Sequence, residues 1–309
     1  MLTGNVAKEG QMSTTDSPAV ARRRVRLALR RAREAKHLTQ GQIAEAMEWS
    51  LSKVMRIEKG DVSISASDLR VLLDFLDVRD PDAVQQLITD ARAARLERWS
   101  PDHSSRENLT PALSSLLQFE AEARAIRYYH PVVVPGLLQT EEYARAVMAN
   151  YDELDEETIQ ARVEFRRRRR EAVLYREDPP QYLAIIDQST LLREVGGPAV
   201  TGRQLQEMLH IMRETAILVR IIPFARGVPI ALLGPFAVLD LADEQNAVLY
   251  REGYMTDDIV HTPREISRHR EIFEKLWPLA LDDAESTSLI QECADLMLAG
   301  GGHRPPGTG

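Results

Sequence analysis

The chain has little of what metalloproteins, secreted proteins and common enzyme classes need. Its 309 residues contain one cysteine, Cys293, which excludes an internal disulfide and a cysteine metal cluster and fits a reducing cytoplasm. The seven histidines are scattered, and His261 and His269 lie eight positions apart rather than the four that would put two ligands on one helix face. The sequence lacks the nucleophile elbow Gly-x-Ser-x-Gly and the glycine-rich phosphate-binding motifs. We therefore expect no metal, no cofactor and no enzymatic activity. Because Cys293 stands among Ala294, Leu296 and Met297, we expect it to be buried as a small apolar side chain.

Long apolar runs are also missing. The most apolar stretch, residues 216–241, is broken by two arginines and three prolines and cannot span a bilayer. Residues 1–11 lack the apolar segment of a secretory signal, and residues 1–19 are predicted to be disordered. Either Met1 or Met12 could be the natural start. These features predict a soluble cytoplasmic protein that makes no membrane contact.

Charge is distributed unevenly along the chain. Residues 20–60 contain eleven Lys and Arg against four Asp and Glu, a net charge of +7, whereas the whole chain has a net charge of −8 and the remainder therefore −15. A basic segment in an acidic chain is typical of a protein that meets nucleic-acid phosphates with one part only. The length of the chain suggests two domains.

Apolar spacing and capping residues predict a helical bundle within this basic segment. A first helix carries an apolar stripe of Val25, Leu29, Ala32 and Ala35. A second helix is expected over 40–47, with Thr39 as its cap and Ile43, Ala44 and Met47 facing inward. A third is expected over 51–59, with Ser50 as its cap and Gly60 at its end. A fourth is expected over 67–76, with Leu69, Leu72, Leu73 and Leu76 facing inward.

The third of these helices has a polar face. At about 100° per residue, Val54 and Ile57 point one way and Ser52, Met55 and Arg56 point the other, with Lys53 beside them. A mainly polar and basic outward face suits a helix that lies in the major groove of DNA. The plainer alternative is an amphipathic bundle of three or four helices with a solvated basic face.

This stretch resembles the XRE-type helix-turn-helix regulators. The resemblance covers about fifty residues and rests on the Thr39-Gln40 opening of the second helix, the Ile43-Ala44 pair and the Arg56-Ile57-Glu58-x-Gly60 close of the third. It implies that Gln40 braces a phosphate or reaches a base, and that Glu58 is tied to an arginine of the first helix. Met55 stands where the family has a small polar residue. The residues that we predict to bind DNA are Thr39, Gln40, Ser50, Ser52, Lys53, Arg56 and Lys59.

The rest of the chain is predicted to be an α+β domain with a small sheet, so that the protein as a whole is mainly α. We expect a disordered segment over 1–19, the helix-turn-helix domain over 20–80, a linker helix and loop over 81–110, the α+β domain over 111–299 and a disordered tail over 300–309. Strands are predicted over 182–186, 217–222, 236–239 and 247–250, the last two as an antiparallel pair. Helices are predicted over 112–126, 141–149, 155–175, 199–214, 263–279 and 283–298.

The second domain also resembles a domain that follows an XRE-type helix-turn-helix domain in actinobacterial regulators. The matching residues include Phe119-Glu120-Ala121-Glu122-Ala123, residues 134–144, which read Val-Pro-Gly-Leu-Leu-Gln-Thr-Glu-Glu-Tyr-Ala, and Val195-Gly196-Gly197-Pro198. In that group a very small companion protein is often encoded beside the regulator, and the pair is described as antitoxin-like or as a developmental and secondary-metabolism switch. The resemblance implies a context and not a mechanism.

Two segments of the second domain are candidates for binding. Glu120, near Arg124 or Arg127, could line a pocket, and residues 135–140 could form a ligand or partner loop; the alternatives are a solvated acidic face and a tight turn that seats Leu137 and Leu138 in the core. Consecutive residues of the run Arg166–Arg170 wrap around a helix, so several are expected to be solvated or paired with Glu164 and Glu171; a second DNA contact or a dimer contact is the alternative. The candidate ligand or partner residues are Glu120, Pro135, Gly136, Gln139 and Thr140.

We interpret the sequence as a DNA-binding transcription regulator. Its partners are expected to be a double-stranded DNA operator and a second copy of the chain, because one short helix rarely supplies enough specificity. The second domain is expected to hold the dimer together and to sense a partner protein or a small-molecule effector. The alternative is an antitoxin-like protein that neutralises a small companion and uses DNA binding for autoregulation.

Overall fold

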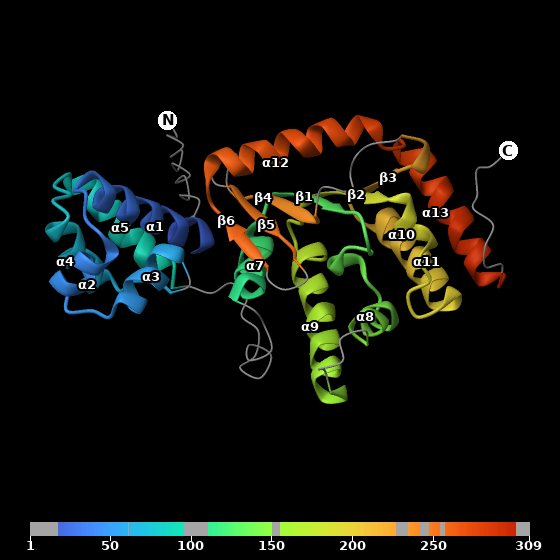
Figure 1. Cartoon of the computed structure of the whole chain (residues 1–309), viewed down its shortest axis with the longest axis horizontal. Coiled ribbons are helices and arrows are strands. Elements are labelled where there is room, and N and C mark those ends of the chain that lie inside the picture. The colour runs from blue at the N-terminus through green and yellow to red at the C-terminus, as the bar shows by residue number, and fades with distance from the viewer. Residues whose placement is uncertain are drawn as a thin grey trace, which may run out of the picture. The chain divides into compact units, whose positions relative to one another are not determined.

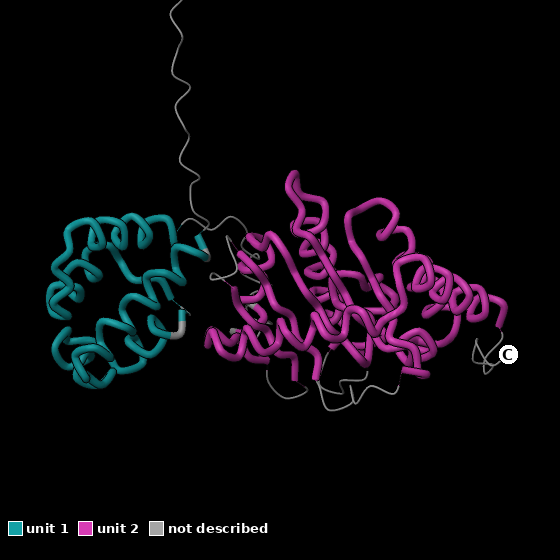
Figure 2. The backbone as a smooth tube through the Cα atoms, turned by 90° about the horizontal axis from the view of Figure 1, so that it is seen from above, with its two compact units in different colours: residues 1–96 teal, residues 97–309 magenta. Residues whose placement is uncertain are grey.

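The chain folds into two compact units. A computed structural model describes residues 18–60, 62–95, 111–149, 155–226, 234–241, 247–253 and 257–300. The units comprise residues 1–96 and 97–309 (Figure 2). The predicted loop 100–108, most of the predicted termini and the connection 242–246 lie outside the described residues. Each unit has its own apolar core.

The first unit is a bundle of helices. Its described elements are α1 (Pro18–Ala35), α2 (Gln40–Ala46), α3 (Leu51–Lys59), α4 (Ala66–Phe75) and α5 (Pro81–Ala93). Their shared core contains Val25, Leu29, Ile43, Ala44, Val54, Ile57, Ile64, Leu69, Leu72, Leu73, Leu76, Ile88 and Ala91.

Two expectations for this unit were wrong. Ala35 is exposed, because it is the last residue of α1 and lies beyond the part of the helix that packs in the core. The helix expected to link the domains, α5, belongs to the bundle. Ile88 and Ala91 lie in the shared core, and Asp90 accepts hydrogen bonds from Arg24 of α1 at 2.7 and 3.0 Å.

The second unit contains a six-stranded mixed sheet in the order β3-β2-β1-β4-β5-β6. β1 pairs in parallel with β2 and in antiparallel with β4, β2 pairs in parallel with β3, and β4, β5 and β6 pair in antiparallel. The strands are β1 (Ala125–His130), β2 (Gln181–Asp187), β3 (Ile217–Ile222), β4 (Phe236–Asp240), β5 (Ala247–Arg251) and β6 (Asp258–Val260).

Helices cover both faces of this sheet (Figure 1). One face packs against α7, α9, α11 and α13 through a large core, and the other packs against α12 through Phe273 and Leu276. Cys293 is fully buried in the larger core, as expected, and burial raises the pKa of its thiol to about 11. The helices are α7 (Pro111–Glu122), α8 (Glu141–Met148), α9 (Glu156–Leu174), α10 (Gln188–Leu192), α11 (Pro198–Glu214), α12 (Pro263–Leu276) and α13 (Asp283–Leu298), and the short 3-10 helices are η1 (Gly136–Leu138), η2 (Phe224–Arg226) and η4 (Trp277–Leu279).

The predicted helix over 112–126 was too long. α7 ends at Glu122, and residues 125–130 form β1 between β2 and β4. Residues 121–125, Ala-Glu-Ala-Arg-Ala, all have high helix propensity, so nothing in the local sequence indicates that the helix ends at Glu122. Pairing with two neighbouring strands decides the conformation of β1, and such pairing depends on residues far away in the sequence.

Candidate nucleic-acid interface

The recognition face is set by the capping and phase of α3. The hydroxyl of Ser50 accepts a hydrogen bond from the backbone N–H of Lys53 at 3.2 Å, and Gly60 ends the helix with a φ of +88°, a conformation that glycine adopts without strain. Val54 and Ile57 are buried, whereas Ser52 and Arg56 are exposed. The predicted phase of this helix is therefore confirmed.

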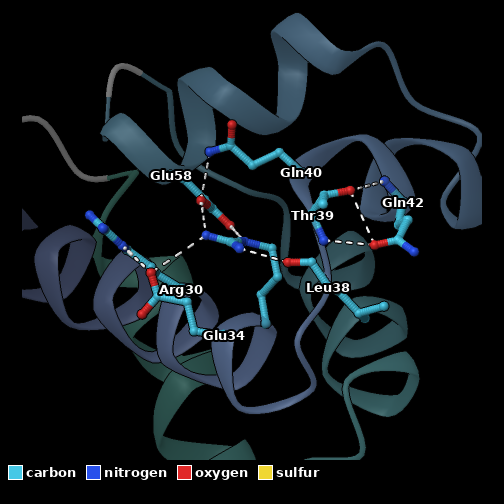
Figure 3. A network of polar contacts seen from close by, with 8 residues as sticks. Arg30, Glu34, Leu38, Thr39, Gln40, Gln42 and Glu58 are labelled. Atoms are coloured by element: carbon cyan, nitrogen blue, oxygen red, sulfur yellow. Dashed lines mark hydrogen bonds and ion pairs between the residues drawn. The ribbon is translucent and has the colours of Figure 1, made fainter.

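A largely buried carboxylate, with 9% of its side chain exposed, ties the first three helices together. Glu58 of α3 accepts two hydrogen bonds from Arg33 of α1, at 2.6 and 3.0 Å, and a third from the Gln40 amide of α2 at 2.7 Å (Figure 3). Arg33 also donates to the Leu38 carbonyl oxygen at 2.8 Å. The hydrogen bond to Glu58 raises the pKa of the Arg33 guanidinium. The tie that we expected between Glu58 and the first helix is present.

The predicted contact residues of α2 take structural positions. Thr39 forms a capping box with Gln42, since its hydroxyl accepts from the Gln42 N–H at 3.2 Å and the Gln42 side chain accepts from the Thr39 N–H at 2.8 Å. Gln40 was expected to meet phosphate or a base, but its amide nitrogen donates to Glu58. In this structure both residues orient the start of α2.

Two of the basic residues predicted on α3 differ in their surroundings. The Lys53 ammonium lies 3.0 Å from Asp68 of α4 and 3.8 Å from the centre of the Trp49 ring, so it is held at the flank of the helix. The Arg56 side chain is exposed, and no hydrogen bond or ion pair joins it to another side chain of the described residues, whereas its carbonyl oxygen accepts from the Gly60 N–H within the helix end. Arg56 is therefore the predicted contact residue of α3 whose charge is not engaged by a described neighbour. The side chain of Lys59 lies outside the described residues.

The net charge of the basic segment overstates its free positive charge. Arg24 pairs with Asp90, Arg33 pairs with Glu58, and Arg30 pairs with Glu34 within the same unit. Part of the excess therefore holds the bundle together. The geometry of α3, rather than the net charge, therefore indicates a surface suited to DNA.

In the second unit, the structure places Glu120 in a buried ion pair. Its carboxylate, with 1% of the side chain exposed, accepts two hydrogen bonds from Arg169 of α9 at 2.7 Å each. Burial alone would lower the pKa of Arg169, but Glu120 raises it well above its usual range. Glu120 therefore joins α7 to α9 and is not a free carboxylate in an open pocket.

The segment 135–140 is a braced turn. The Gln139 amide donates to the Val134 carbonyl oxygen at 2.8 Å, and Gln204 of α11 accepts from the Thr140 N–H at 2.6 Å while donating to the Leu138 carbonyl oxygen at 2.7 Å. Leu137 and Leu138 are buried, and Thr140 caps α8. The turn interpretation accounts for these contacts. Pro135 is buried at the start of η1, and a side chain at Gly136 would touch Arg169.

The arginine run on α9 is divided among several roles. Arg167 donates to Glu164 and Glu171, and Arg168 donates to Glu164, so these two are paired at the surface as expected. The hydrogen bond from Arg167 is the largest of the effects that lower the pKa of Glu164 to about 2. Arg170 donates to the Leu137 carbonyl oxygen at 3.1 Å and pairs with Glu207, which braces the turn.

A polar cluster at the carboxyl ends of β1 and β5 was missed from the sequence; Tyr128 and His130 are buried in it and Glu252 is partly exposed. Tyr128 donates to Glu252 at 2.9 Å, and His130 Nδ1 accepts from the backbone N–H groups of Val132 and Val133 at 3.3 and 3.2 Å, which leaves its proton on Nε2, 3.7 Å from Glu252. Burial raises the pKa of Glu252, but its contacts with His130 and Tyr128 outweigh this and leave it lowered. Only the pairing of β1, β4 and β5 brings these residues together, so no local signal marked them.

The described residues show neither a metal site nor a membrane-spanning helix. They contain no group of three or more His, Cys, Asp and Glu side chains placed to hold a metal ion. None of their helices is long and apolar enough to cross a membrane.

Family comparisons assign both units. Residues 25–87 match the family described as a helix-turn-helix domain, and the first unit is accordingly a DNA-binding domain of this class. Residues 113–292 match the family described as a domain of unknown function (DUF5753), and the chain, more than half of which this match covers, belongs to that family. No curated protein and no solved structure matches the chain.

Proposed function

We propose that the protein is a sequence-specific transcription regulator of the XRE type that acts in the cytoplasm. The observation that carries this proposal is α3: a capped helix with a buried side at Val54 and Ile57 and an exposed side that presents Ser52 and Arg56. Such a helix enters the major groove with its N-terminal residues at the base edges. In this proposal Arg56 binds a guanine through two hydrogen bonds, and the caps at Thr39 and Ser50 orient the two helices of the motif.

The second unit is proposed to hold a homodimer together and to sense a partner protein or a small ligand. We also propose that the second unit is not an enzyme, in keeping with the lack of the common catalytic motifs in the sequence. The context suggested by the sequence, an actinobacterial regulator with an antitoxin-like second domain, is part of this proposal.

Replacing Arg56 by alanine is expected to weaken operator binding by about 1 to 3 kcal/mol and to relax the preference at one base position. The control is Arg70→Ala, which removes the same charge from the exposed surface of α4. We expect the control to change the affinity for all sequences alike. Binding titrations of both variants against an operator and its single-base variants test this. An Arg56 variant that discriminates between bases as the parent does would contradict the proposed docking.

The full chain is expected to be a homodimer held by residues after about 110. Two recognition helices would then lie about 34 Å apart, or a multiple of that distance, and the operator would be an inverted repeat. A fragment of residues 1–100 should be monomeric and bind DNA weakly, with a shallower salt dependence because fewer phosphates are neutralised. Light scattering measures the molar mass, and hence the oligomeric state, of the fragment and of the full chain. A monomeric full chain, or a dimeric fragment that binds as tightly as the whole, would refute this division of roles.

A second candidate function follows from the size of the second unit, which is larger than the DNA-binding unit. In this alternative the chain neutralises a small companion protein and binds DNA only for autoregulation. The test begins with a search for a small open reading frame beside the gene, whose product is then expressed with and without the regulator. Co-expression that yields a stoichiometric complex and abolishes the companion's toxicity supports the alternative, whereas toxicity unaffected by the regulator counts against it.

A further inference from the structure

Two large apolar side chains on α3 are exposed to solvent. Leu51 and Met55 are 50% and 39% exposed, respectively, although the apolar residues Val54 and Ile57 on the same helix are buried. Their positions, four residues apart, place them one turn from each other on one side of the helix. Neither belongs to the core of the first unit. Packing within this unit therefore does not explain them.

Leu51 and Met55 form a row beside the polar contact residues. At about 100° per residue, Ser52 and Arg56 form the next row around the helix, also one turn apart. Both rows begin in the first turn of α3, directly after the cap at Ser50. In a docked recognition helix, this N-terminal turn is the part that meets the base edges. The apolar row therefore belongs to the face that we propose to enter the groove.

DNA offers one apolar partner on the floor of the major groove. This is the 5-methyl group of thymine, and the other base edges present hydrogen-bond donors and acceptors. Leu51 and Met55 cannot donate or accept a strong hydrogen bond, so an edge of guanine, adenine or cytosine would leave its polar atoms unpaired against them. The chemistry of the row thus selects thymine.

We propose that Leu51 and Met55 read thymine methyl groups in the operator, beside the base contact made by Arg56. This inference rests on the proposed function. Residues four apart on a helix are separated by about 6 Å along its axis, close to two base-pair steps of about 3.4 Å. Each half-site therefore contains thymines about two base pairs apart on the face of the groove that α3 occupies.

The test compares thymine with uracil, which differs only by the missing methyl group. The full-length protein is first used to select binding sites from random DNA duplexes. The selected duplex is then remade with deoxyuridine at one thymine position at a time, and binding is measured by titration. At the two contacted positions, we expect each substitution to weaken binding about fourfold, the effect of leaving one methyl group unburied. Thymines elsewhere in the duplex should be insensitive.

Protein variants assign each methyl group to its side chain. Met55→Ala should bind the thymine and uracil duplexes equally at one position, and Leu51→Ala should do so at the other. The matched control is Val71→Ala, which shortens a side chain that is 59% exposed on α4 and should keep both methyl effects. All three positions are at the surface, so thermal melting of the variants should stay close to that of the parent.

The outcomes separate this inference from the proposed function. If no site is enriched from the random duplexes, the protein is not a sequence-specific DNA binder and both proposals fail. If a site is selected but uracil binds as tightly as thymine at every position, the regulator stands and the thymine contact is wrong. A methyl effect that persists unchanged in both Leu51→Ala and Met55→Ala also overturns it. If these two variants instead change the oligomeric state and leave DNA binding intact, the apolar row covers another protein surface.

Discussion

Replacing Val54 by aspartate is expected to unfold the first unit. The Val54 side chain is 3% exposed and packs in the core shared by the helices of the bundle, so a carboxylate there would be buried without a partner. Burying an unpaired charge costs about 4 kcal/mol or more, a large part of the ~5 to 15 kcal/mol that stabilises a typical domain. Circular dichroism during thermal melting should show that the melting transition of the first unit is lost, while the melting transition of the second unit remains.

The neighbouring residue supplies the control. Met55→Asp introduces the same charge one position further along α3, where the side chain is exposed, and should change the free energy of unfolding by less than about 1 kcal/mol. A Val54→Asp variant that melts like the parent would mean that the helix faces the bundle with its other side. If Met55→Asp destabilises the unit as much as Val54→Asp does, then Met55 is buried too and the assignment of this face to the surface is wrong.

Replacing Arg169 by methionine is expected to destabilise the second unit by about 3 to 5 kcal/mol. The substitution keeps much of the side-chain volume but removes both hydrogen bonds to Glu120, whose carboxylate would remain buried without a partner. Chemical denaturation followed by tryptophan fluorescence or circular dichroism measures the loss. Replacing both residues, as Glu120→Leu with Arg169→Met, should recover most of the stability, because no charge is then left unpaired.

The adjacent arginine separates burial from charge. Arg168 is 49% exposed and pairs with Glu164 at the surface, so Arg168→Met should cost less than about 1 kcal/mol. If Arg169→Met is as mild as Arg168→Met, the ion pair between α7 and α9 contributes little. In that case the role assigned to the inward arginine of the run is wrong.

The helix-turn-helix unit was predictable because its signals are local. Thr39 and Ser50 cap the helices that follow them, and Gly60 ends α3, so the bounds of α3 were predicted to the residue and those of α2 to within one. The apolar period then fixed which side of α3 is buried. The engagement of Gln40 with Glu58 was not predictable, because it depends on where α2 and α3 lie relative to each other.

In the second unit, some elements could be predicted from the local sequence and others could not. The strand from Ile217 to Ile222 and the helix from Asp283 to Leu298 have the predicted bounds, since each has a clear apolar pattern and clear punctuation. β1, the short β6 and α10 were missed, because their conformations depend on strand partners and packing. Glu120, Gln139 and Thr140 were named from the sequence only as candidates for ligand or partner binding, beside the alternatives of a solvated face and a tight turn. Their partners, Arg169 and Gln204, follow 49 and 64 positions after Glu120 and Thr140, and only the structure reveals them.

The place of β1 in the sheet has a consequence for synthesis of the chain. β1 joins the parallel strands to the antiparallel ones, and one side of it pairs with β4, where Arg127 meets Asp240 after an interval of 113 positions. On the ribosome, β1 and β2 emerge long before β4, so one edge of a buried strand stays open during elongation. Unpaired strand edges promote association between chains, and contacts of such long sequence separation form slowly. The nascent second unit is thus most vulnerable to aggregation, and most dependent on chaperones, in the interval between synthesis of β1 and of β4.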